Sequence, residues 1–111
     1  MNDMMQKFID KFQAKGDTCI VIIPKNITTK LELLNSLGSQ LRFPANFGTN
    51  WDAFDESIDD LEWMAEKNIL IIYEEFPKIL AKDFNIYFEI LRDASNFWKE
   101  DGSKSLVVVF L

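Results

Sequence analysis

Four carboxylates share one side of a predicted helix near the middle of the chain. When residues are placed about 100° apart, the period of an α-helix, four acids fall together; these are Asp52, Asp55, Glu56 and Asp59. Residues 50–66 contain seven acids and no Lys or Arg. Like charges four positions apart on a helix surface cost about 0.2–0.5 kcal/mol each. A stripe that opposes the stability of its own helix predicts a basic partner, although a solvated face is the alternative.

A turn precedes this helix, and its residue types favour a turn by themselves. Pro44 fixes its φ angle, and Gly48 permits either a positive φ or a close approach by another chain. Thr49 or Asn50 can cap the helix, and Thr49 with Asp52 resembles a weak capping box. Asp52 is also favoured by the helix dipole, a reason that the later acids of the stripe lack.

Carboxylates also serve catalysis, so an enzyme has to be weighed against a binding protein. Paired acids serve glycosidases, and clustered acids hold Mg²⁺ or Ca²⁺. The sequence has no Ca²⁺-loop spacing, no Gly-rich phosphate loop and no His, the commonest general base. A helical stripe directs its carboxylates side by side into solvent rather than around an ion. We therefore predict a protein that is not an enzyme and has no cofactor or metal, with a metal-dependent hydrolase as a third alternative.

Composition narrows the class of partner. The chain has 111 residues and a net charge of −6, with 14% aromatic residues. A nucleic-acid binder needs a basic patch, so nucleic acid is not expected as a partner, nor is an anionic membrane surface. The negative charge instead favours fast association with a cationic protein. Cys19 is the single cysteine and lies in an apolar run, so we expect a buried side chain rather than a reactive thiol.

Periodicity predicts an α/β fold in one domain spanning residues 1–111, with residues 1–17 as an N-terminal helical extension. Short apolar runs predict strands at 18–23, 69–73 and 105–111. Helical spacing predicts further helices at 3–14, 28–41 and 83–99. Apolar strands separated by helical crossovers predict a parallel sheet with right-handed connections.

Two of these helices carry detailed expectations. In the helix at 28–41, Thr28 or Thr29 is the expected cap, and the apolar face is expected at Leu31, Leu34, Leu37 and Leu41. In the helix at 83–99, Asp83 is the expected cap. Asp93 lies off the apolar stripe of that helix and could bring a further carboxylate to the acidic face, a point that the sequence leaves open.

The ends of the chain and its apolar runs bear on location. The N-terminus has no charged start followed by an apolar core, so no signal peptide is visible. The longest apolar runs fall far short of the ~20 residues of a membrane span. We therefore expect a cytoplasmic protein.

A longer pattern surrounds the acidic helix. Residues 43–54 read F-P-x-x-F-G-x-N-W-D-A-F, and residues 90–94 read I-L-R-D-A in the last helix, before a charged turn and a closing apolar strand. In this order of elements, residues 18–111 resemble the barstar family of intracellular ribonuclease inhibitors. The resemblance implies a small α/β fold with a three-stranded parallel sheet, and an inhibitor that plugs a ribonuclease active site with its second helix and the preceding loop.

The resemblance also assigns roles by position. Asp52 matches a family acid that contacts the enzyme, and Glu56 takes the place of the central family Asp, which mimics substrate phosphate. Asp93 takes the place of a family Glu on the last helix, while Gly48 and Asn50 match the binding loop. These positions coincide with the acidic face identified from the residues alone.

The chain departs from the family at several contact positions. Asn46 stands where the family has a Tyr, Asp55 where it has a Trp, and Glu56 is one methylene longer than the family Asp. The predicted target is therefore a basic ribonuclease or a toxin of another kind, bound by a chain that is monomeric when free. The alternative is an acidic interaction module with a barstar-like fold whose target is not a nuclease. The predicted partner-binding residues are Asn46, Gly48, Asn50, Asp52, Asp55, Glu56, Asp59 and Asp93.

Overall fold

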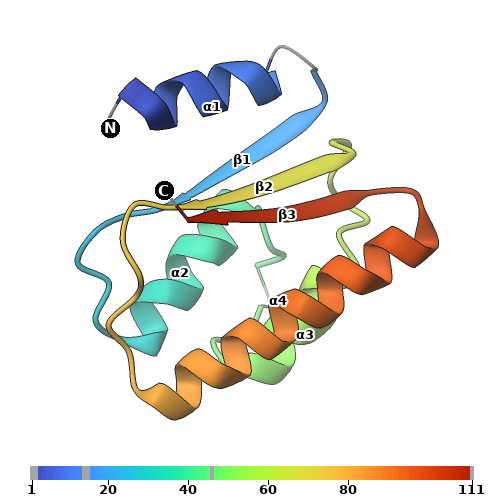
Figure 1. Cartoon of the computed structure of the whole chain (residues 1–111). Coiled ribbons are helices and arrows are strands. Elements are labelled where there is room, and N and C mark those ends of the chain that lie inside the picture. The colour runs from blue at the N-terminus through green and yellow to red at the C-terminus, as the bar shows by residue number, and fades with distance from the viewer. Residues whose placement is uncertain (1–2, 14–15, 46, 111) are drawn as a thin grey trace.

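Along the described residues, four helices and three strands follow one another in the predicted order (Figure 1). The computed structural model describes residues 3–13, 16–45 and 47–110. The elements are α1 (Asp3–Gln13), β1 (Thr18–Ile23), α2 (Lys30–Gln40), α3 (Trp51–Ile58), β2 (Asn68–Tyr73), α4 (Ala81–Asp101) and β3 (Ser105–Phe110). The predicted α/β class with a three-stranded parallel sheet is confirmed.

The sheet has the strand order β1-β2-β3, and both neighbouring pairs are parallel. In register, Cys19 faces Ile69 across the first pair, and Ile69 faces Leu106 across the second. The central strand β2 is buried on both faces from Ile69 onward, as its continuous apolar sequence predicts.

The connections place three helices on the same face of the sheet. Because the strand order advances in one direction, right-handed crossovers put both connections on one side. Figure 1 shows α2, α3 and α4 below the sheet and α1 above it. Alternate strand residues, such as Val21, Ile71 and Leu106, belong to the core between the sheet and those three helices.

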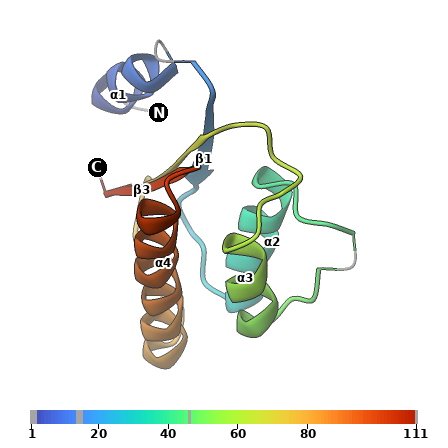
Figure 2. The same cartoon turned by 90° about the vertical axis from the view of Figure 1, so that its right-hand side faces the viewer.

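The other face of the sheet is covered by α1. Met5 and Ile9 from this helix pack with Leu70 and Ile72 of β2 in a second apolar cluster. The view in Figure 2 sets α1 apart from the other helices, across the sheet. The N-terminal helix therefore covers part of the core of this structure.

The apolar face of α2 differs from the expected one. Leu31 is 53% exposed, whereas Leu33 is buried together with Leu34 and Leu37. Thr29 is the cap and forms a full capping box with Glu32, so that α2 starts at Lys30. Leu31 lies in the first turn and faces solvent, whereas Leu34, Leu37 and Leu41 are buried as expected.

The expected cap of α4 was also wrong. This helix starts at Ala81, and the residue at its cap position, Leu80, forms no side-chain cap hydrogen bond. Asp83 lies in the first turn, where its Oδ1 accepts a hydrogen bond from the indole Nε1 of Trp51 at 3.0 Å. The carboxylate of Asp83 therefore accepts a hydrogen bond from another helix instead of capping its own helix.

The packing of α1 gives a matched pair of substitutions. Met5 is 1% exposed and its neighbour Met4 is 68% exposed. We expect Met5→Ala to lower the free energy of unfolding by about 2 kcal/mol through the lost burial and the cavity, and Met4→Ala by less than about 0.5 kcal/mol. Urea unfolding measures both values. Equal effects would contradict the docking of α1 and the prediction of one domain over 1–111.

Candidate functional site

The candidate site lies on residues 43–63, called here the acidic segment, which comprise a loop, α3 and the turn after it. Asn46 lies outside the described residues, so its predicted contact role stays a prediction. In Figure 2 the loop between α2 and α3 stands out at the right-hand edge of the molecule. The segment therefore lies in the helical layer, on the opposite side of the sheet from α1.

The acidic segment begins with an ordered cap. Asn50 is the N-cap of α3, and its Oδ1 accepts a hydrogen bond from the backbone N–H of Ala53 at 2.8 Å. The capping box suggested for Thr49 and Asp52 does not form. A Cβ atom on Gly48 would lie 3.0 Å from Nδ2 of Asn50, so this glycine makes room for the cap side chain. Gly48 is not among the glycines with a positive φ.

One side of α3 is buried. Trp51, Phe54 and Ile58 all belong to the main core. The rings of Trp51 and Phe54 each lie 5.8 Å from the ring of Tyr87 on α4. Aromatic pairs at this separation add to the stabilisation that burial provides. The apolar side therefore fixes which side of α3 faces solvent.

α3 is shorter than the acidic stripe. It ends at Ile58, with Asp59 as its C-cap. Leu61 is also buried, and it lies beyond the helix at a positive φ of 48°. Acids near a helix C-terminus meet the negative end of its dipole, and the last turn of α3 has no basic residue. The charge pattern that marks the site thus also disfavours continuing the helix.

The acids of α3 are exposed to different degrees. Asp52, Asp55 and Glu56 are exposed, whereas Asp59 is half-buried. Glu56 also lines a hollow of about 230 Å³ between α3 and the preceding loop. Asp60, a second acid on its wall, was not among the predicted partner-binding residues.

Asp59 is in an unusual position for a carboxylate. Its Oδ1 atom is buried and has no hydrogen-bond partner among the described residues. Burial raises the pKa of Asp59, and the nearby carboxylates of Asp55 and Asp93 raise it further. The structure thus brings Asp93 of α4 close enough to act on α3, which the sequence had left open. Asp93 itself is exposed and pairs with Arg92 at 3.4 Å.

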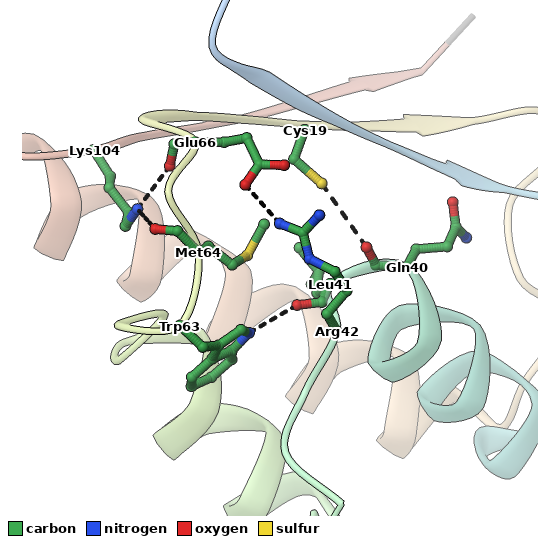
Figure 3. Close-up of polar contacts among 8 residues, drawn as sticks. All are labelled: Cys19, Gln40, Leu41, Arg42, Trp63, Met64, Glu66 and Lys104. Atoms are coloured by element: carbon green, nitrogen blue, oxygen red, sulfur yellow. Dashed lines mark hydrogen bonds and ion pairs between the residues drawn. The ribbon is translucent and has the colours of Figure 1, made fainter.

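The ends of the acidic segment meet beneath the sheet (Figure 3). Just before the segment, Arg42 forms an ion pair with Glu66, with Nη2 and Oε1 2.5 Å apart. Lys104, ahead of β3, donates from Nζ to the backbone oxygens of Met64 at 2.9 Å and Glu66 at 2.6 Å. Cys19 is buried nearby, as expected, and burial raises the pKa of its thiol.

The sequence model of one protein family, described as Barstar (barnase inhibitor), matches residues 18–110. The chain belongs to the barstar family. The barstar match runs from β1 to β3 and includes the whole acidic segment, while α1 lies outside it. No individual curated protein matches the chain.

Two further features bear on the alternatives considered above. Within residues 3–13, 16–45 and 47–110, no three His, Cys, Asp or Glu side chains come together in a group that could hold a metal ion. The hydrolase alternative therefore gains no support from these residues. None of the helices in this part of the barstar-family chain has the length and apolarity needed to cross a bilayer.

The position of Asp59 predicts a stability that depends on pH. A raised pKa means that the folded protein holds this proton more tightly than the unfolded chain, so ionised Asp59 opposes folding at pH 7. The penalty vanishes as the pH falls below about 4, where the carboxyl is protonated in both states. We expect Asp59→Asn to raise the melting temperature at pH 7, with the gain closing toward pH 4.

Thermal unfolding of wild type and variant across this pH range measures the effect. Asp60→Asn, which changes the same charge at an exposed neighbour, serves as the control and should give a smaller gain at pH 7. An Asp59→Asn gain that is equal at both ends of the range would show that ionisation is not its cause.

Proposed function

We propose that this chain is a protein inhibitor that blocks the active site of a basic ribonuclease, or of a related toxin, with its acidic segment. The exposed carboxylates of α3 carry the proposal. No ion pair in the described part of the chain uses an acid of α3, although pairs form elsewhere on the surface. The acids thus remain available to a partner, in a region that belongs to an inhibitor family.

The proposed mechanism is electrostatic and steric. A ribonuclease lines its active site with Arg and Lys side chains that bind RNA phosphates, and carboxylates can pair with the same groups. Complementary charge speeds the diffusional encounter, and salt screens this effect. Once docked, α3 occupies the cleft and excludes RNA, so no residue of this chain needs a catalytic role.

Two parts of the acidic face supply different contacts in this proposal. Glu56 and Asp60 flank the hollow beside the loop, which can receive a basic side chain of the target. Asp59 and Asp93 lie toward α4 and supply a second contact, with Asp55 beside them. Asp52 lies between these groups on the helix surface, since successive residues turn by about 100°.

The burial of Asp59 fits a carboxylate that waits for a partner. An ionised group without a hydrogen bond raises the free energy of the unbound inhibitor. A target Arg or Lys placed beside the exposed part of this carboxylate offsets its charge, so the penalty is reduced in the complex. Binding energy then depends on a group that contributes nothing favourable to folding.

The proposal also includes the cellular location of the protein and the position of its gene. A cell that makes a toxic ribonuclease needs its inhibitor in the cytoplasm, and the genes for the two are expected side by side. We therefore propose an immunity protein that is monomeric when free and acts as a single domain. Nucleic acid and membranes are not proposed partners.

Glu56→Ala tests the central contact. Truncating one member of a buried interfacial charge pair costs about 2–5 kcal/mol of binding free energy. Barnase and barstar are themselves the usual example of such pairs, so this magnitude belongs to the family rather than to this chain. The fold should be no less stable, because Glu56 is exposed and its repulsion with Asp52 is removed. Calorimetric titration and thermal unfolding give the two numbers.

Asp10→Ala is the matched control, since it removes one exposed negative charge from α1 on the far side of the sheet. It should change the binding free energy by less than about 0.5 kcal/mol. A drop in melting temperature for Glu56→Ala would instead mark the acid as structural. Unchanged binding would remove Glu56 from the interface.

The target itself can be captured from a lysate of the source cell at low salt. We expect the wild-type chain to retain a basic ribonuclease and to inhibit its activity, and the double variant Asp52→Ala/Glu56→Ala to retain neither effect. Capture of a partner with no nuclease activity would favour the alternative module. Equal capture by both baits would move the interface away from α3.

A further inference from the structure

Each of the three tryptophans donates its indole N–H to a hydrogen bond that has either its donor or its acceptor on the acidic segment. Trp63, at the end of the segment, donates to the backbone oxygen of Leu41, the C-cap of α2, at 3.0 Å (Figure 3). Trp51, at the start of α3, donates to Oδ1 of Asp83 on α4 at 3.0 Å. These two bonds tie the segment to both neighbouring helices.

The third tryptophan reaches the segment from outside. Trp98 of α4 donates to the backbone oxygen of Ile58, the last residue of α3, at 2.9 Å. The last four carbonyls of a helix lack intrahelical partners, so this bond satisfies one that would otherwise be buried without a partner. α3 is therefore held at its start, at its end and at the turn that follows.

The segment needs such support because α3 cannot stabilise itself. It has eight residues, whereas isolated helices shorter than about 12–15 residues are marginal in water. Its acids repel one another, and those in its last turn oppose the helix dipole. Arg42 and Leu61, near the two ends of the segment, also adopt left-handed backbone conformations with φ of 56° and 48°. These conformations persist only where surrounding contacts determine them.

We propose that Trp51, Trp63 and Trp98 are positioning residues for target binding, whose indole hydrogen bonds hold the acidic segment in its binding conformation before the target arrives. The expected effect on target binding rests on the proposed function. The three indole hydrogen bonds, called tethers here, do not depend on it. A segment ordered in advance loses little conformational entropy on binding. Loss of a tether should therefore weaken the complex although no contact with the target has been removed.

Trp63→Phe tests one tether with little change in packing. A phenylalanine ring can keep the edge contact with Phe43, whose ring centroid lies 5.8 Å away, while the N–H is lost. In the free protein we expect amide hydrogen exchange in residues 47–60 to become about 3- to 10-fold faster, the effect of one neutral hydrogen bond. Amides of β2 should change less. For the ribonuclease captured by the wild-type chain, Kd should rise by a similar factor.

Ile72→Val is the matched control, because Ile72 is fully buried in the cluster beneath α1, on the face of the sheet away from α3. It lowers global stability without touching a tether, so Kd should stay unchanged. Unchanged exchange in residues 47–60 of Trp63→Phe would overturn the proposal, as would an equal rise in Kd for Ile72→Val. Failure of the proposed function would appear separately, as a wild-type chain that inhibits no ribonuclease.

Discussion

The handedness of two connections governs the layout of this protein. A parallel sheet whose strands advance in one direction sends every right-handed crossover to the same face. The helices α2, α3 and α4 therefore share one side of the sheet, and the acidic segment, which includes α3, packs against the other two helices. The opposite face would be left with Leu70 and Ile72 uncovered, and α1 closes it. The barstar match begins at β1, so α1, which covers that face, lies outside the matched residues.

Folding and binding make opposing demands on α3. Its apolar side is fully committed to the core through Phe54 and Ile58. Its acidic side carries repulsion that lowers stability, and Asp59 adds a buried oxygen without a partner among the described residues. The core contacts and tethers outweigh these costs, so the charges can be kept for a partner. A helix selected only for stability would mix Lys or Arg into this face.

Apolar periodicity in the sequence predicted the structure correctly where burial follows the local sequence pattern. The order of elements, the parallel sheet and the buried side of α3 were all predictable, because apolar spacing determines which side of an element enters the core. The ends of helices were less predictable. Thr29, one of the two expected caps, precedes α2, and Leu31 in the first turn faces solvent although Leu34 and Leu37 are buried as expected. Apolar spacing alone did not show that the buried face begins at Leu33 rather than at Leu31.

The missed features of the site depend on distant partners. Asp83 satisfies every local rule for a cap, yet it accepts a bond from Trp51, which lies 32 residues earlier. The half-burial of Asp59 and its proximity to Asp93 follow from how α3 packs on α4, which no local pattern encodes. Asp60 was left out of the predicted binding residues, although packing of the loop against α3 places it beside the same hollow as Glu56. Sequence identified the acidic face, while tertiary packing divided it into distinct environments.

The placement of the tryptophans has a spectroscopic consequence. Indole dominates the intrinsic fluorescence of a protein, and all three indoles of this chain are anchored on the acidic segment or bonded directly to it. The sheet and α1 contain no tryptophan, so they contribute almost nothing to that emission. The ultraviolet emission of the unlabelled protein thus reports the surroundings of the acidic segment and of the core on which that segment packs.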